Sequence, residues 1–94
     1  MYGAELIEKE QIPNVKFVSH EVLKSTDAIK HRTIELERAA TIGNAHKGKI
    51  KIIFETKDGL KEVETTVWSA TEKYITLKGE VLIPVNAIKD VIIY

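Results

Sequence analysis

The second half of the chain alternates apolar and polar residues in short runs, and turn residues separate these runs. A strand sends successive side chains to opposite faces of a sheet, so this period of two predicts strands. The predicted strands are 49–55, 60–69, 74–77, 81–85 and 91–94, and the turns lie at 57–59, 70–72, 78–80 and 86–87. Residues 48–94 are therefore predicted to form an uninterrupted β-meander.

Asp58-Gly59 is a strong hairpin signal, because glycine accepts the positive φ of a tight turn. The residues predicted to face inward are Ile50, Ile52, Phe54, Val63, Thr65, Val67, Ile75 and Leu77. Trp68 falls on the other face of its strand. We expect it to join the core beneath the helix or the N-terminal segment, and the alternative is an exposed contact residue.

Residues 25–44 predict a helix. Ser25-Thr26-Asp27 offers N-cap side chains, and residues 28–42 contain neither proline nor glycine. Gly43-Asn44 is predicted to end the helix, because glycine supplies the left-handed conformation of a C-cap. Residues 1–24 form a lead-in, with a short strand predicted at 15–19. All 94 residues are expected to form a single domain.

The predicted helix has apolar residues on two sides. At 100° per residue, one side carries Ile29, Leu36, Ala39 and Ala40. Ile34 and Ile42 lie near the opposite side and flank Arg38. This second stripe indicates that the N-terminal segment covers the far side, or that another subunit does so through Ile34, Arg38 and Ile42. The alternative is two isoleucines that are simply exposed.

Composition narrows the function classes. Fourteen Lys and Arg residues balance fourteen Asp and Glu residues, and each half of the chain carries seven of each sign. Duplex-DNA binders usually show a basic excess, so this class is disfavoured. Cysteine is absent, which excludes disulfides and thiolate metal sites. The sequence has no bilayer-length apolar run, and its charged N-terminus is unlike a signal peptide. A cytoplasmic location is therefore expected.

The strongest local candidate for ligand binding is a run of alternating lysines after the predicted helix. Lys47, Lys49 and Lys51 could line one edge, with Arg38 nearby, and hold the phosphates of single-stranded RNA. Trp68 could stack on an unpaired base. The alternative is that these lysines form the solvated side of an amphipathic strand.

Catalytic and metal chemistry have little support in the sequence. His31 and Glu35 are spaced to share a helix face, but two ligands do not make a metal site. Glu62 and Glu64 alternate along one strand face and could form a carboxylate pair, although such residues are usually just solvated. No nucleophile elbow or phosphate loop is present. A non-enzymatic protein without a cofactor is therefore expected.

The order of a helix, curved strands and a one-turn link to a last strand resembles the Sm-like and SH3-like small barrels. The segments 51–59, 74–78 and 83–92 carry this resemblance, which is greatest for the bacterial Sm-like proteins and the Rho-inhibitor type barrel. It implies RNA binding and ring assembly. The chain lacks the Asn-Gly or Arg-Gly loop signature of uridine recognition, so no functional residue is carried over. Residues 35–49 and 63–68 also look like small uncharacterised bacterial proteins of the Bacteroidetes type.

The sequence thus predicts an α+β fold, in which one amphipathic helix precedes a small, strongly bent antiparallel meander or barrel of Sm-like or SH3-like type. The expected function is a protein-binding or regulatory module, with self-association as one form of it. The alternative is a single-stranded RNA-binding module that uses the lysine edge.

Overall fold

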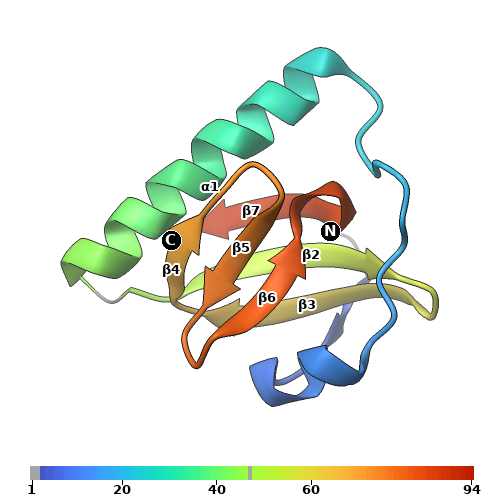
Figure 1. The fold of residues 1–94 in the computed structure, drawn as a ribbon, viewed down its shortest axis with the longest axis horizontal. Coiled ribbons are helices and arrows are strands. Elements are labelled where there is room, and N and C mark those ends of the chain that lie inside the picture. Colours follow the sequence, from blue (N-terminus) through green and yellow to red (C-terminus); the bar gives the residue numbers. More distant parts are fainter. Residues whose placement is uncertain (1–2, 47) are drawn as a thin grey trace.

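The computed structural model describes residues 3–46 and 48–94, and these residues form an α+β fold (Figure 1). They contain one α-helix and seven strands in two sheets. The helix is α1 (Thr26–His46), and two 3-10 helices are η1 (Lys9–Asn14) and η2 (Val85–Ala87). The strands are β1 (Glu5–Leu6), β2 (Ile50–Thr56), β3 (Gly59–Thr65), β4 (Val67–Ala70), β5 (Tyr74–Leu77), β6 (Val81–Pro84) and β7 (Ile88–Ile93).

The larger sheet has the strand order β1-β3-β2-β7, and the smaller sheet has the order β4-β5-β6. In Figure 1 the smaller sheet lies in front of β2 and β3. The prediction of an uninterrupted meander is wrong for the last strand, because η2 leads the chain back to the larger sheet, where β7 pairs antiparallel with β2. Within the described residues, no strand pairing closes the two sheets into a barrel.

The predicted strand 60–69 is divided by Thr66. Residues before this point pair with β2 in the larger sheet, and residues after it pair with β5 in the smaller sheet. The backbone carbonyl of Thr66 accepts a hydrogen bond from the Lys78 amide at 2.9 Å, so the bend is tied to the β5–β6 turn. Val63, Thr65 and Val67 are all buried as predicted.

The core lies between the two sheets and under the helix. The inward positions predicted from alternation are confirmed, since Ile52, Phe54, Ile75 and Leu77 are all fully buried. Leu36 and Ala39 join this core from α1, and Ile12 joins it from η1. The helix begins as predicted, because the Ser25 hydroxyl accepts the Ala28 amide at 3.0 Å.

The predicted helix end at Gly43-Asn44 is wrong, because α1 continues to His46. Gly43 is buried, and a Cβ built on it would lie 2.0 Å from the backbone oxygen of Val67. Glycine is needed here because the helix backbone packs directly against the backbone of β4, which leaves no room for a side chain. It does not supply the left-handed turn that the sequence suggested.

The lead-in also differs from its prediction. The strand expected at 15–19 is reduced to a single bridge between Phe17 and Thr56. The pairing of β1 with β3 and the helix η1 were not predicted. In the part of the chain that the structure describes, no helix has the length and apolarity needed to cross a membrane.

Candidate functional site

The predicted lysine edge is only partly described by the structure, and one of its described lysines is paired with a carboxylate. Lys49 is exposed, and Lys47 lies outside the described residues. Lys51 forms an ion pair with Glu62 at 2.9 Å. The hydrogen bond to Glu62 and the charges of Glu62 and Glu64 raise the pKa of the Lys51 ammonium, which stays charged but is compensated. One of the three lysines is therefore committed to neighbouring carboxylates.

Arg38 is compensated in a similar way. Its guanidinium lies 3.5 Å from the carboxylate of Glu35, three residues earlier on the helix. Glu35 is thus the ion-pair partner of Arg38 on the same helix. Among residues 3–46 and 48–94, no three His, Asp or Glu side chains gather as metal ligands.

Glu62 and Glu64 belong to a surface network on the larger sheet. Glu62 binds Lys51, and the Tyr94 hydroxyl donates to a carboxylate oxygen of Glu64. This hydrogen bond raises the pKa of the Tyr94 hydroxyl. Each carboxylate has a partner, so the two glutamates are part of an ion and hydrogen-bond network on the sheet surface.

The second stripe of the helix is only partly exposed. Ile34 is 55% exposed, so the described part of the N-terminal segment does not cover it. Ile42 is partly buried, and a Cβ built on Gly48 would lie 3.2 Å from its Cγ2 atom. Ile34 and Arg38 are therefore the open members of this stripe.

Trp68 is exposed, and the expectation that it belongs to the core is wrong. Its exposed fraction is 44%. The register of β4 against β5 shifts between Val67 and Ser69, so Trp68 and Ser69 stand opposite the single residue Thr76. Trp68 follows buried Val67 and so faces outward, as alternation requires, and at the bulge the next residue, Ser69, is exposed as well.

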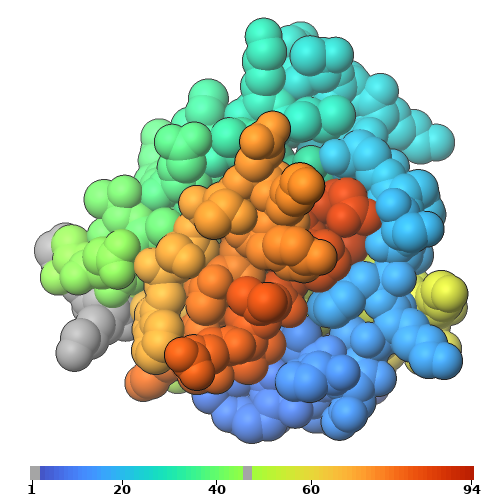
Figure 2. Space-filling model, viewed as in Figure 1, coloured from blue at the N-terminus to red at the C-terminus, as the bar shows by residue number. Residues whose placement is uncertain are grey.

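Trp68 lies at one side of an exposed apolar surface on the smaller sheet. Leu82 pairs with Thr76, and Tyr74 pairs with Pro84, so these residues share the outer face of β4-β5-β6. Tyr74 is 48% exposed and Leu82 is 51% exposed. Figure 2 views the molecule from the side on which this sheet lies in front. We call this surface the aromatic face, and its members are Trp68, Tyr74, Thr76, Leu82 and Pro84.

A hollow lies at each end of the aromatic face. The groove beside Trp68 has a volume of ≈ 450 Å³. Its lining residues are Gly43, Asn44, Thr66, Trp68 and Lys78. The hollow beside Tyr74 and Pro84 has a volume of ≈ 290 Å³, and Glu21 and Arg32 form part of its wall.

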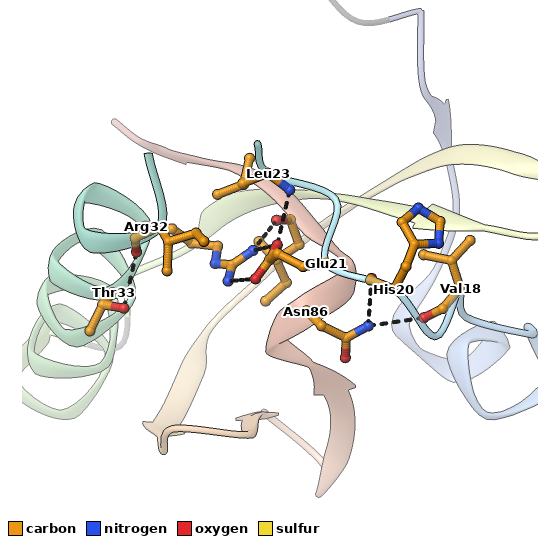
Figure 3. Close-up of polar contacts among 9 residues, drawn as sticks. Val18, His20, Glu21, Leu23, Arg32, Thr33 and Asn86 are labelled. Carbon is orange, nitrogen blue, oxygen red and sulfur yellow. Dashed lines mark hydrogen bonds and ion pairs between the residues drawn. The ribbon is translucent and has the colours of Figure 1, made fainter. Parts of the chain in front are cut away.

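Arg32 anchors the lead-in to the helix beside this second hollow (Figure 3). Its guanidinium donates to both Glu21 carboxylate oxygens, at 2.7 and 2.5 Å, and to the Ile88 carbonyl at 3.1 Å. These bonds lower the pKa of the Glu21 carboxyl, chiefly through Arg32. The nearby Asn86 amide donates to the carbonyls of Val18 and His20, which fixes the same segment.

The sequence interpretation missed Arg32, which is only 5% exposed. A signal was available, because Arg32 precedes Leu36 by one turn and so lies on the buried stripe of the helix. A charged residue at such a position is rarely buried without a partner, which would have pointed to a carboxylate in the lead-in.

Comparison of the chain with protein-family models, with curated proteins and with solved structures gave no match.

Proposed function

We propose that the protein is a non-enzymatic protein-binding module and that the aromatic face is its contact surface. The observation that carries this proposal is the display of Trp68, Tyr74 and Leu82 together on one face of a three-stranded sheet, each about half exposed. Large aromatic side chains dominate the energetics of protein contacts, because they bury much area at a small entropic cost.

The size of the aromatic face favours a short peptide segment as its partner. A large apolar side chain has an accessible surface area of roughly 200 Å² when it is fully exposed. At 44, 48 and 51% exposure, the three large side chains therefore offer about 300 Å². A standard interface buries about 800 Å² on each partner, so this face alone is too small for a stable pairing of folded domains. A peptide that crosses three short strands matches it better.

Single-stranded RNA is the alternative partner. Exposed Trp68 and Tyr74 could stack on bases, but a binding groove for RNA also needs cations that follow the phosphates. Lys51 and Arg38 are paired with carboxylates, so the charge support for RNA is weaker than the sequence suggested.

We also propose that the fold is of the Sm-like or SH3-like type. Three features support this: the bend at Thr66, the single 3-10 turn η2, and the return of β7 to pair with β2. Such folds carry many functions, so the proposed activity depends on the aromatic face and not on the fold type.

Self-association through Ile34, Arg38 and Ile42 remains a second proposal. The 55% exposure of Ile34 on the outer side of α1 supports it. The partly buried state of Ile42 limits the area that this stripe can offer.

The test is a screen of arrayed random peptides against three forms of the protein. The wild type should retain a set of related peptides, and the variant Trp68→Ser/Leu82→Ser should lose them. Ile34→Ser is the matched control, because it removes an equally exposed apolar side chain outside the aromatic face. The proposal fails if no peptide is retained or if both variants behave alike. RNA oligonucleotides applied to the same three proteins show whether the face binds nucleic acid instead.

A further inference from the structure

The groove beside Trp68 is built from three parts of the chain. Gly43 and Asn44 come from the last turns of α1, Thr66 and Trp68 from the bend and the bulge, and Lys78 from the β5–β6 turn. Its volume of ≈ 450 Å³ lies within the usual range for ligand pockets. The groove opens at the Trp68 end of the aromatic face, so a peptide lying across that face would reach it.

The walls of the groove are fixed by backbone contacts. At Gly43 the helix lies against the Val67 carbonyl so closely that no side chain would fit. The Lys78 amide donates to the Thr66 carbonyl at 2.9 Å, which joins the turn to the bend. The turn is tight, with positive φ at Gly79 and Glu80. The groove is therefore largely formed before a ligand arrives.

The described residues give the groove a positive charge. Among the described residues that line it, Lys78 is the one charged side chain. Across residues 3–46 and 48–94, no carboxylate lies within ion-pair distance of the Lys78 ammonium. Beside this charge stands the half-exposed indole of Trp68, and the Asn44 amide can both donate and accept hydrogen bonds. An apolar group and one carboxylate would complement these walls.

We propose that this groove selects a peptide in which a glutamate or aspartate adjoins a large apolar residue. The apolar side chain packs on the indole of Trp68, and the carboxylate pairs with the Lys78 ammonium. Asn44 is placed to hydrogen-bond the peptide backbone between them. This inference rests on the proposed peptide-binding function and adds the chemistry of the partner. The described lining of the groove supplies one lysine, which suits one carboxylate better than the repeated phosphates of RNA, whose binding requires several cations.

The experiment uses Trp68 as its own reporter, because the sequence contains one tryptophan. Emission is followed while a capped hexapeptide containing leucine next to glutamate is added, and then its counterpart with glutamine in place of glutamate. We expect the wild type to bind the glutamate peptide about fivefold more tightly at low salt, the size of an exposed ion pair. Lys78→Met should remove this preference and keep the binding of the glutamine peptide. Lys78→Glu should favour a lysine peptide instead.

Lys73→Met is the matched control, since Lys73 lines the other hollow and should leave the preference unchanged. Equal binding of both peptides by the wild type would overturn the charge selection while leaving the peptide-binding function intact. Loss of both peptides in Lys78→Met would also overturn it, because the lysine would then act on the structure of the groove. Failure of both peptides to shift the emission would reject this partner chemistry, and the array screen decides the function separately. A uridine oligonucleotide that binds and is lost in Lys78→Met would assign the groove to nucleic acid.

Discussion

Gly43→Ala is the substitution that most directly tests the packing of α1 on β4. Inside an exposed helix, alanine is favoured over glycine by about 1 kcal/mol. If Gly43 were an exposed residue near the end of the helix, Gly43→Ala would be at least as stable as the wild type. The structure predicts the opposite, because the new Cβ would lie 2.0 Å from the Val67 oxygen and 3.1 Å from the Thr66 Cγ2 atom.

The magnitude follows from this overlap. An ordinary carbon–oxygen contact is about 3.3 Å, so the helix and strand must separate by more than ~1 Å. Overpacking of a dense interior costs about 1–3 kcal/mol, and a backbone clash of this depth belongs at the upper end. Subtracting the gain of about 1 kcal/mol in helix propensity leaves a net destabilisation of about 2 kcal/mol. For a domain of this size, that lowers Tm by about 8–16 °C.

The assay is urea unfolding followed by far-ultraviolet circular dichroism, with thermal unfolding as a second measure. Thr41→Ala is the control, since Thr41 is exposed on the same helix and should change stability by no more than about 0.6 kcal/mol. A lower midpoint with an unchanged urea dependence is the expected result for Gly43→Ala. Wild-type stability or better in this variant would refute the close approach of α1 to β4.

The remaining predictions concern the Arg32 anchor, the exposed tryptophan and the second helix stripe. Glu21→Gln should lower the free energy of unfolding by about 1–2 kcal/mol at pH 7, because buried Arg32 loses its charged partner. Glu72→Gln is the control, because Glu72 lines the same hollow. Urea unfolding measures the stability of both variants. Because Arg32 depresses the folded pKa of Glu21, this stabilisation is present above the unfolded pKa of about 4.3 and is lost as the pH falls through the folded value. The difference between wild type and Glu21→Gln should therefore shrink below about pH 4, and a constant difference would contradict this reasoning. Trp68→Ala should cost less than about 1 kcal/mol, against about 3–5 for a buried tryptophan, and acrylamide should quench the native emission. If self-association uses the second stripe, light scattering should give a dimer mass that Ile34→Glu converts to monomer, and a monomeric wild type ends that proposal.

The local patterns of the sequence were sufficient for the elements and for most of the core. Alternation identified Ile52, Phe54, Ile75 and Leu77 as inward residues, because the two-residue period of a strand depends only on neighbouring positions. The N-cap at Ser25 and the turn at Gly59, whose φ is +110°, were likewise readable from local chemistry. These features need no knowledge of what packs against them.

The candidate site could not be predicted from local sequence patterns, because each of its parts depends on how separate segments of the chain pack together. Trp68 stays exposed because neither the helix nor the described lead-in covers the outer face of the smaller sheet, and the placement of Gly43 follows from the backbone of β4. The burial of Arg32 depends on Glu21 in the lead-in, 11 residues away. The sequence by itself determined which segments become helix and strand and which strand faces are apolar. Tertiary structure decided where the strand bends, where β7 returns and which apolar side chains stay in water, because those outcomes depend on the partner that each surface finds.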